Sequence, residues 1–216
     1  MKKGAPTIEM DVQTAAEEWA NRITHGFGLL LSLGGLVVLV LASAPQGTIS
    51  LAGSTIFGVT LILMFATSTL YHSFLVSPRR PLLHLLDHVA IYLFIGGSYT
   101  AFALCFFDGG LPWAMMGLEW GVVLLAIAYK IFSTNRYGPF SIVFYLVIGW
   151  LGGALIAPMA AVAPAGCVTL FVVGGVCYMV GVVFFAWERL PYNHAIWHVF
   201  VLAGSLCHCL AVALFV

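Results

Sequence analysis

Long apolar stretches alternate with short polar breaks along the whole chain. A helix that crosses a membrane needs about 20 mostly apolar residues. The stretches of this kind are residues 25–43, 50–75, 85–107, 112–132, 140–158, 165–187 and 194–216. The breaks between them contain proline, glycine or asparagine, which disfavour continuation of a helix. The pattern therefore predicts an all-α integral membrane protein with seven transmembrane helices.

The segment ahead of the first stretch is polar, and its pattern predicts a helix of its own. Thr14 and Glu17 have the spacing of a capping box, in which the two side chains satisfy each other's backbone N–H groups. We expect this helix to be short, to run through Trp19 and to lie at the membrane interface; a flexible tail is the alternative. The chain is accordingly divided into a cytoplasmic N-terminal segment, residues 1–24, and a seven-helix transmembrane domain, residues 25–216.

The basic residues predict how the helices are oriented. With alternating spans, all eight lysines and arginines fall on the same side of the membrane. They are Lys2, Lys3, Arg22, Arg79, Arg80, Lys130, Arg136 and Arg189. Basic residues are enriched on the cytoplasmic side of membrane proteins, so we expect a cytoplasmic N-terminus and an external C-terminus.

The composition agrees with a membrane protein and excludes other classes. Charged residues make up 7% of the chain and hydrophobic residues 62%, whereas soluble domains carry about 25% charged residues. The net charge is zero, which argues against a nucleic-acid partner because phosphate binding needs a basic surface. The cysteines form no CxxC pair and are expected to pack as small apolar residues. They are Cys105, Cys167, Cys177, Cys207 and Cys209.

Four polar side chains inside the apolar stretches are predicted to lie at a similar depth. His72, Asp87, His194 and His198 are each five to nine residues from an arginine that borders their stretch. At a helical rise of 1.5 Å per residue, these offsets place the four groups about 7–14 Å from the basic edge. Polar groups inside a bilayer are costly and mark functional sites. This layer is the strongest indication of function in the sequence.

The residue types in this layer suit a zinc ion. His194 and His198 are four residues apart, so both rings lie on one helix face, and Ser68 and His72 have the same spacing. Three neutral imidazoles with a water in the fourth position form the open, catalytic type of zinc site. Asp87 would bind through that water or take its proton. Ser68 would orient the water or donate to a substrate oxygen.

The other histidines, and one glutamate inside an apolar stretch, have several interpretations. His25 opens the first stretch near the same layer, as a fourth ligand or as a partner of a ligand. His88 is expected to pack or to contact a ligand, His84 to be solvated in a turn, and His208 to pack. Glu119 lies in the fourth stretch, nearer the outside, where it caps a helix, pairs locally or stays neutral.

Several motifs together resemble those of the bacterial hemolysin III family, a branch of the adiponectin and progestin receptor-like superfamily. They are EWANRITHG (18–26), STLYH (68–72), DHVAIY (87–92), GSYT (97–100) and PYNHAIWH (191–198). The resemblance implies a location in the bacterial inner (plasma) membrane and a cytoplasm-facing zinc site with His72, His194 and His198 as ligands. It further implies that Asp87 acts through a water and that Ser68 is the motif serine. Receptor members of the superfamily are associated with ceramide hydrolysis, whereas the family name refers to a cytolytic activity.

These observations lead to one main functional hypothesis and several alternatives. The main hypothesis is a zinc-dependent, ceramidase-like hydrolase that acts on an amide or ester bond of a membrane lipid, which enters laterally between helices. The first alternative is a non-enzymatic, zinc-stabilised membrane sensor or regulator. A cytolysin or pore is disfavoured because no stretch shows a continuous polar stripe. A proton- or ion-coupled transporter is disfavoured because the polar groups cluster at one depth. No soluble protein partner is implied.

Overall fold

A computed structural model describes residues 13–134, 137 and 139–216 of the chain, and within these residues it contains helices and no strands. It has 7 helical segments that are long and apolar enough to cross a membrane, which confirms the predicted fold class. The elements are α1 (Ala15–Ser43), the 3-10 turn η1 (Ala44–Gln46), α2 (Thr48–Ser73), α3 (Arg80–Phe106), α4 (Leu111–Phe132), α5 (Pro139–Gly153), α6 (Ile156–Val162), α7 (Ala165–Phe185) and α8 (Asn193–Phe215). The chain is a multi-pass membrane protein.

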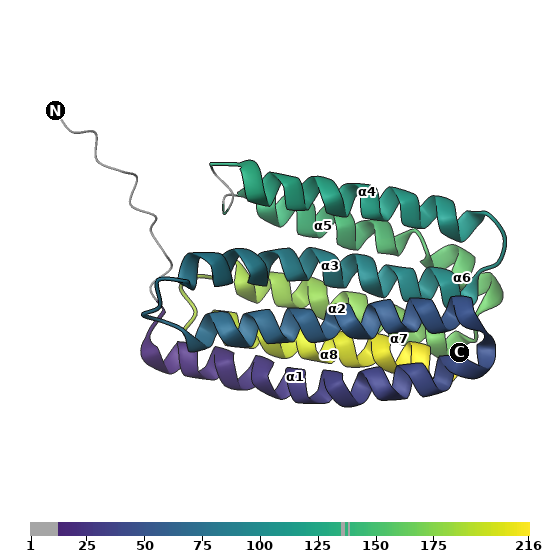
Figure 1. The fold of residues 1–216 in the computed structure, drawn as a ribbon, viewed down its shortest axis with the longest axis horizontal. Helices are drawn as coiled ribbons and strands as arrows, with labels where there is room; N and C mark the ends of the chain where they lie inside the picture. The colour runs from purple at the N-terminus through teal and green to yellow at the C-terminus, as the bar shows by residue number, and fades with distance from the viewer. Residues whose placement is uncertain (1–12, 135–136, 138) are drawn as a thin grey trace.

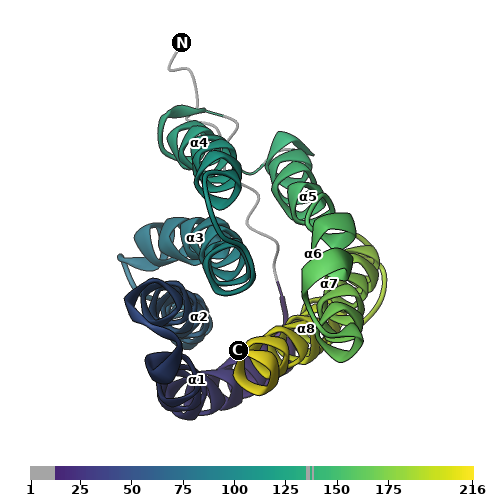
Figure 2. The same cartoon turned by 90° about the vertical axis from the view of Figure 1, so that its right-hand side faces the viewer.

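The helices lie side by side and follow one another around a ring in chain order (Figures 1 and 2). Each helix packs mainly on its neighbours in the sequence, and α8 closes the ring against α1. Large apolar side chains cover the outside, for example Leu30, Leu41 and Leu214, which are 66–68% exposed. An outer surface of this kind suits lipid, since the bilayer interior accepts apolar side chains without penalty.

The capping box is present, but the helix that it opens is the first transmembrane helix itself. Thr14 N donates to Glu17 Oε2 at 2.8 Å, and Glu17 N donates to Thr14 Oγ1 at 3.3 Å. The expected separate interfacial helix, with a boundary after residue 24, is replaced by one continuous helix from Ala15 to Ser43. The physical reason is that no proline interrupts this segment. Residues 15–24 therefore belong to the bundle.

The fifth span is broken where the sequence predicted a continuous helix over residues 140–158. α5 ends at Gly153 and α6 begins at Ile156, and the two form one span, Phe140–Val162. Pro158 has no N–H to donate to the carbonyl of Ala154, and its ring clashes with that carbonyl. The chain therefore turns at residues 154–155, where N–H groups donate three residues back, as Leu155 does to Gly152 at 3.0 Å.

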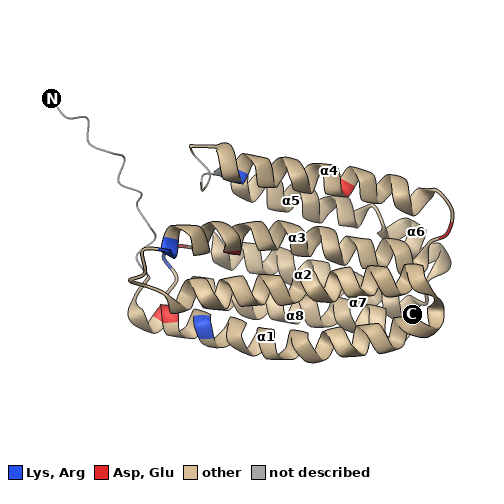
Figure 3. Cartoon of the chain, in the orientation of Figure 1, with Lys and Arg blue, Asp and Glu red and all other residues tan. Residues whose placement is uncertain are grey.

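The charged residues gather toward one end of the bundle, with few acidic exceptions (Figure 3). The described basic residues border the ends of helices that meet there: Arg22, Arg79, Arg80, Lys130 and Arg189. Lys2, Lys3 and Arg136, which were counted with them in the sequence, lie outside the described residues. The shared end agrees with the predicted alternation of spans. That this end faces the cytoplasm stays a prediction from the charge distribution.

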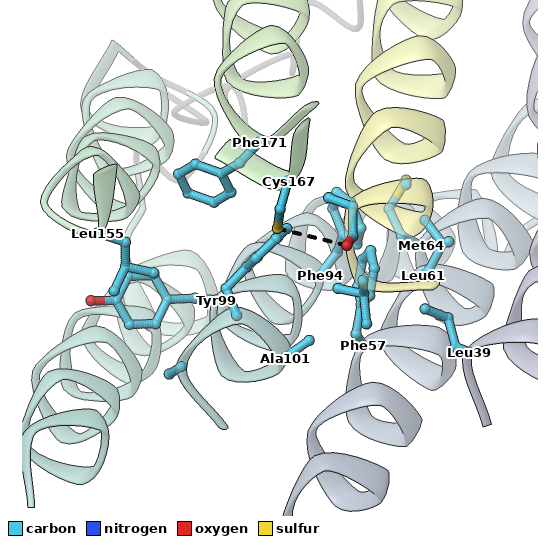
Figure 4. Packing of buried hydrophobic residues seen from close by; sticks show 14 of the residues in the cluster. Leu39, Phe57, Leu61, Met64, Phe94, Tyr99, Ala101, Leu155, Cys167 and Phe171 are labelled. Carbon is cyan, nitrogen blue, oxygen red and sulfur yellow. Dashed lines mark hydrogen bonds between the residues drawn. The ribbon is translucent and has the colours of Figure 1, made fainter. Parts of the chain in front are cut away.

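An apolar core occupies the part of the bundle away from the basic end. Figure 4 shows its side chains from α1, α2, α3 and α7, with Leu155 from the α5–α6 connection. Cys167 is part of this core and donates through Sγ to the carbonyl of Ala211 at 3.7 Å. All five cysteines are free, as expected for packing residues. The core fixes the helices in position and leaves the polar residues gathered near the opposite end.

Gly204 lies where α7 and α8 approach each other closely, and it yields a stability prediction. A Cβ at Gly204 would lie 2.5 Å from the Tyr178 ring and 2.9 Å from the carbonyl oxygen of Gly174. Because a backbone oxygen cannot rotate away, Gly204→Ala is expected to push the helices apart and to lower the unfolding free energy by about 1–3 kcal/mol. Thermal unfolding of the detergent-solubilised protein measures the effect.

Gly175→Ala is the matched control on α7. A Cβ there meets nothing within 4 Å, so the higher helix propensity of alanine leaves stability unchanged or raises it by about 0.5–1 kcal/mol. Equal unfolding temperatures for the two variants would contradict the close packing of Gly204.

Candidate metal centre

Three histidines predicted as metal ligands lie together inside the bundle. His72 is near the end of α2, and His194 and His198 are in the first turns of α8. One ligand atom from each ring lies within 4.8 Å of the other two. Their ring centroids are 4.6–5.2 Å apart. This grouping confirms that the three side chains can hold a metal ion, as the matched depths predicted.

The loop before α8 determines where the helix that carries His194 and His198 begins. Tyr192 adopts a left-handed conformation with φ of 60°, which is uncommon for a residue other than glycine. Asn193 Nδ2 donates to the carbonyl of Phe185 at 3.0 Å, so the start of α8 is tied to the end of α7. His194 and His198, one turn apart on α8, consequently face the same neighbour. That neighbour is the end of α2 with His72.

A carboxylate from α1 contacts the ring of His72 and determines which of its nitrogens carries the hydrogen. Its Nδ1 lies 2.5 Å from Glu18 Oε2, and a carboxylate accepts hydrogen bonds, so Nδ1–H donates. Nε2 of the neutral ring is then an acceptor, and it is buried without a hydrogen-bond partner among the described residues. An unpartnered buried acceptor is unfavourable. Coordination of a metal ion by Nε2 would remove this penalty, so the ring fits a ligand.

His198 is held in the same way by the backbone of α1. Its Nδ1 lies 3.3 Å from the carbonyl oxygen of Asn21 and 3.1 Å from Thr24 Oγ1. A carbonyl oxygen only accepts, so Nδ1–H is the donor and Nε2 carries the free lone pair. Such contacts behind a ligand fix its tautomer and the orientation of its ring. Two of the three candidate ligands are therefore oriented by α1.

Asp87 and Ser68 lie beside the three histidines and are not part of the group of ligand atoms. Asp87, on α3, is 7% exposed, and its carboxylate lies close enough to His72 and Ser68 to interact with both electrostatically. Ser68 is one turn before His72 on α2 and is 1% exposed. Its Oγ lies near enough to the Asp87 carboxylate for a weak hydrogen bond. A buried carboxylate and a neighbouring hydroxyl thus border the predicted site.

His25 contacts a candidate ligand and does not join the group of three. Its ring stacks on His198 with centroids 3.4 Å apart and an angle of 16° between the planes. The edge of Phe65 lies 5.1 Å away on another side. Both nitrogens of His25 are buried without a partner in the described part of the chain. Of the two roles left open by the sequence, this contact fits the partner of a candidate ligand.

His84 differs from its prediction as a solvated turn residue. α3 already begins at Arg80, so His84 lies in its second turn. Its ring stacks between Tyr71 at 4.7 Å and Tyr137 at 4.2 Å. The reason is that Pro81 starts the helix: proline is favoured in the first turn, where its missing N–H has no acceptor to serve. From the sequence, this proline was interpreted only as a break between helices.

Three further predicted residues make their closest contacts with residues other than the candidate ligands. His88 donates to or accepts from Tyr145 Oη through Nδ1 at 2.8 Å, a packing contact between α3 and α5. His208 stacks on Phe171 with centroids 5.2 Å apart, which confirms its packing role. Glu119 is 1% exposed, and its oxygens accept no hydrogen bond from any other described residue, so the expected local cap or pair is not formed there.

Glu18 and Arg80 also contact the site, and the sequence did not predict a role for either of them there. Glu18 Oε1 accepts from Arg80 Nη2 at 2.6 Å, and Oε2 contacts His72. A signal was present: Glu18, Asn21 and His25 are spaced by three and four residues, which places them on one helix face. All three are buried in α1. The signal went unused because residues 1–24 were separated from the first span.

Comparisons with known proteins identify the family of the chain. Residues 13–209 match the family described as "Haemolysin-III related". The chain is 41% identical to Hemolysin-3 of Bacillus cereus over 194 residues, covering 89% of each chain. It is 40% identical to the Hemolysin-3 homolog of Bacillus subtilis over 89% of this chain and 91% of the relative. A more distant relative is the human Monocyte to macrophage differentiation factor, 27% identical over 98% of this chain and 90% of the relative. The chain therefore belongs to the haemolysin III family.

Proposed function

We propose that the protein is a membrane-embedded zinc hydrolase that cleaves an amide or ester bond of a membrane lipid, as a ceramidase does. One observation carries the proposal: three grouped histidines are bordered by a buried carboxylate, Asp87, and by the buried hydroxyl of Ser68 beside it. Three imidazole ligands leave the fourth position of a tetrahedral zinc ion open. A purely structural zinc site is usually closed by four protein ligands.

The side chains around the site supply the remaining steps of hydrolysis. When bound, zinc activates a water and polarises a carbonyl group as a Lewis acid. Asp87 accepts a proton from the attacking water and then delivers it to the leaving nitrogen or oxygen. Ser68 Oγ–H donates to the carbonyl oxygen as negative charge develops there. A carbon–oxygen bond to water forms, the carbon–nitrogen or carbon–oxygen bond of the lipid breaks, and the products are a fatty acid and an amine or alcohol.

A groove between α5 and α7 supports lateral entry of a lipid. It has a volume of about 540 Å³ and is lined by Leu146, Met179, Val182, Val183, Ala186 and Trp187. Its lining reaches the end of α7, and the adjacent Phe185 ring lies 5.5 Å from His194. An apolar groove that opens to the side of the bundle accommodates an acyl chain, since apolar surface is the common feature of ligand pockets.

A structural metal is the second candidate function, and the packing of two helices favours it. α2 packs mainly on α1 and α3, whereas α8 packs mainly on α7 and α1. The three histidines come from α2 and α8, so a metal ion would connect helices that otherwise have little contact. In this case the ion stabilises the bundle of a sensor or regulator, and turnover is absent.

Ser68→Ala tests the hydrolase. We expect the purified protein in lipid nanodiscs to release fatty acid from an N-acyl sphingoid lipid or a lipid ester, measured by mass spectrometry. Loss of the hydroxyl that stabilises the developing charge should lower kcat by about 10²–10³ while metal content stays unchanged. Ser73→Ala is the matched control, because Ser73 Oγ on the same helix donates to the carbonyl of Thr69.

The outcomes separate the candidate functions. Zinc binding without release of fatty acid from any lipid amide or ester would contradict the hydrolase and support the structural metal. Leakage of dye from protein-containing vesicles, without lipid cleavage, would instead support the pore suggested by the name of the bacterial relatives. Equal kcat for Ser68→Ala and Ser73→Ala would remove Ser68 from the mechanism.

A further inference from the structure

Two consecutive glutamates at the start of α1 contact the two segments that carry the candidate ligands. Glu17 Oε1 accepts from the backbone N–H of Tyr192 at 3.0 Å, two residues before His194. Glu18 Oε2 lies 2.5 Å from Nδ1 of His72. α1 provides no member of the histidine group. Its N-terminal turns nevertheless hold both sides of that group in place.

The carboxylate of Glu18 is fixed at both of its oxygens. Oε1 accepts from Arg80 Nη2 at 2.6 Å, and the side chains of Glu18 and Arg80 are 5% and 9% exposed. The Arg80 guanidinium also lies 4.9 Å from the centre of the Tyr71 ring. A carboxylate paired with a guanidinium remains an acceptor-only group with a defined direction. Oε2 is therefore held as an acceptor that faces His72.

We propose that Glu18 is a positioning residue of the metal centre, whose carboxylate orients His72 with Nδ1–H toward α1 and Nε2 toward His194 and His198. The proposal rests on the metal site of the proposed function and gives Glu18 no part in bond cleavage. Three contacting residues have different roles. The imidazole of His72 binds the ion, the carboxylate of Glu18 sets the tautomer of that imidazole, and Arg80 fixes the carboxylate.

The chemistry of the imidazole makes this role measurable. A neutral histidine has one N–H, and only the nitrogen without hydrogen can bind a metal. An amide at position 18 can donate to Nδ1 as well as accept from it, so the ring can then carry its hydrogen on Nε2. That tautomer cannot bind the ion through Nε2, the nitrogen that faces His194 and His198. Loss of a hydrogen-bond partner behind a ligating histidine weakens metal affinity by about 10–100-fold.

Zinc affinity of three variants tests the proposal. The full chain in detergent is stripped of metal and titrated with Zn²⁺ against a chelator of known affinity. We expect Glu18→Gln to raise the Kd for zinc by about 10–100-fold. Arg80→Gln removes the group that fixes the carboxylate but keeps the carboxylate beside His72, so it should raise the Kd for zinc clearly less than Glu18→Gln does. Glu188→Gln, at an exposed position before α8, should have no effect.

A spectroscopic signature adds a readout that loss of stability does not mimic. In metal-free protein labelled with ¹⁵N-histidine, the His72 signal, assigned with His72→Ala, should report hydrogen on Nδ1 in wild type. The signal of hydrogen on Nε2 should appear in Glu18→Gln.

Equal weakening of zinc binding by Glu18→Gln and Arg80→Gln would overturn the proposal, because the ion pair alone would then account for the effect. Wild-type affinity in Glu18→Gln would also overturn it and leave the metal site intact, whereas a wild-type protein that binds no zinc would overturn the metal site itself.

Discussion

Replacement of both α8 histidines is expected to remove the metal from the protein. Wild type, purified without chelators, should contain about one zinc per chain, and His194→Ala/His198→Ala should contain only the background level, by elemental analysis. The reason is that the double variant leaves His72 as the single remaining ligand of the group of three. One imidazole does not hold zinc against the water that surrounds the purified protein.

Thermal unfolding gives the same prediction a second readout. A ligand that binds only the folded state at 1,000 times its Kd stabilises that state by about 4 kcal/mol. Added zinc should therefore raise the unfolding temperature of wild type and leave the double variant unchanged. His208→Gln is the control on α8, because His208 packs on Phe171 away from the group. Wild type that carries no metal, or a double variant that retains one zinc, would refute the metal centre.

Asp87→Asn is expected to separate turnover from metal binding. The carboxylate is buried beside His72 and Ser68, where it can take a proton from water and return it to the leaving group. An amide has nearly the same shape but cannot carry the proton. Loss of such a general acid–base group lowers kcat by about 10²–10⁴. Zinc content should remain that of wild type, because the three histidines are untouched.

The measurement pairs lipid turnover with metal content in the same preparations. Asp108→Asn is the matched control, since Asp108 is exposed in the connection between α3 and α4 at the other end of the bundle. Its kcat and zinc content should equal those of wild type. A zinc-free Asp87→Asn variant would make Asp87 a metal ligand, and an active one would exclude it from proton transfer.

Local sequence patterns predicted α2, α4, α7 and α8 to within two residues at each end. The capping box at Thr14 and Glu17 was also predicted correctly. Both signals depend on residues within a turn or two of one another. The break in the fifth span and the early start of α3 were misjudged for a common reason. Pro158 interrupts a helix and Pro81 begins one, and the same residue type has opposite effects in the interior and in the first turn.

By itself, the sequence determined the all-α class, the approximate spans and the membership of His72, His194 and His198 in one polar layer. These features follow from apolar length, helical spacing and the cost of polar groups in lipid, which act along one chain segment at a time. Only the tertiary structure decided which faces meet inside that layer. Because α8 closes the ring against α1, Glu18 reaches His72, and Asn21 and Thr24 reach His198. Contacts between residues 54 to 177 positions apart depend on the lateral packing of whole helices, and no local pattern specifies that packing.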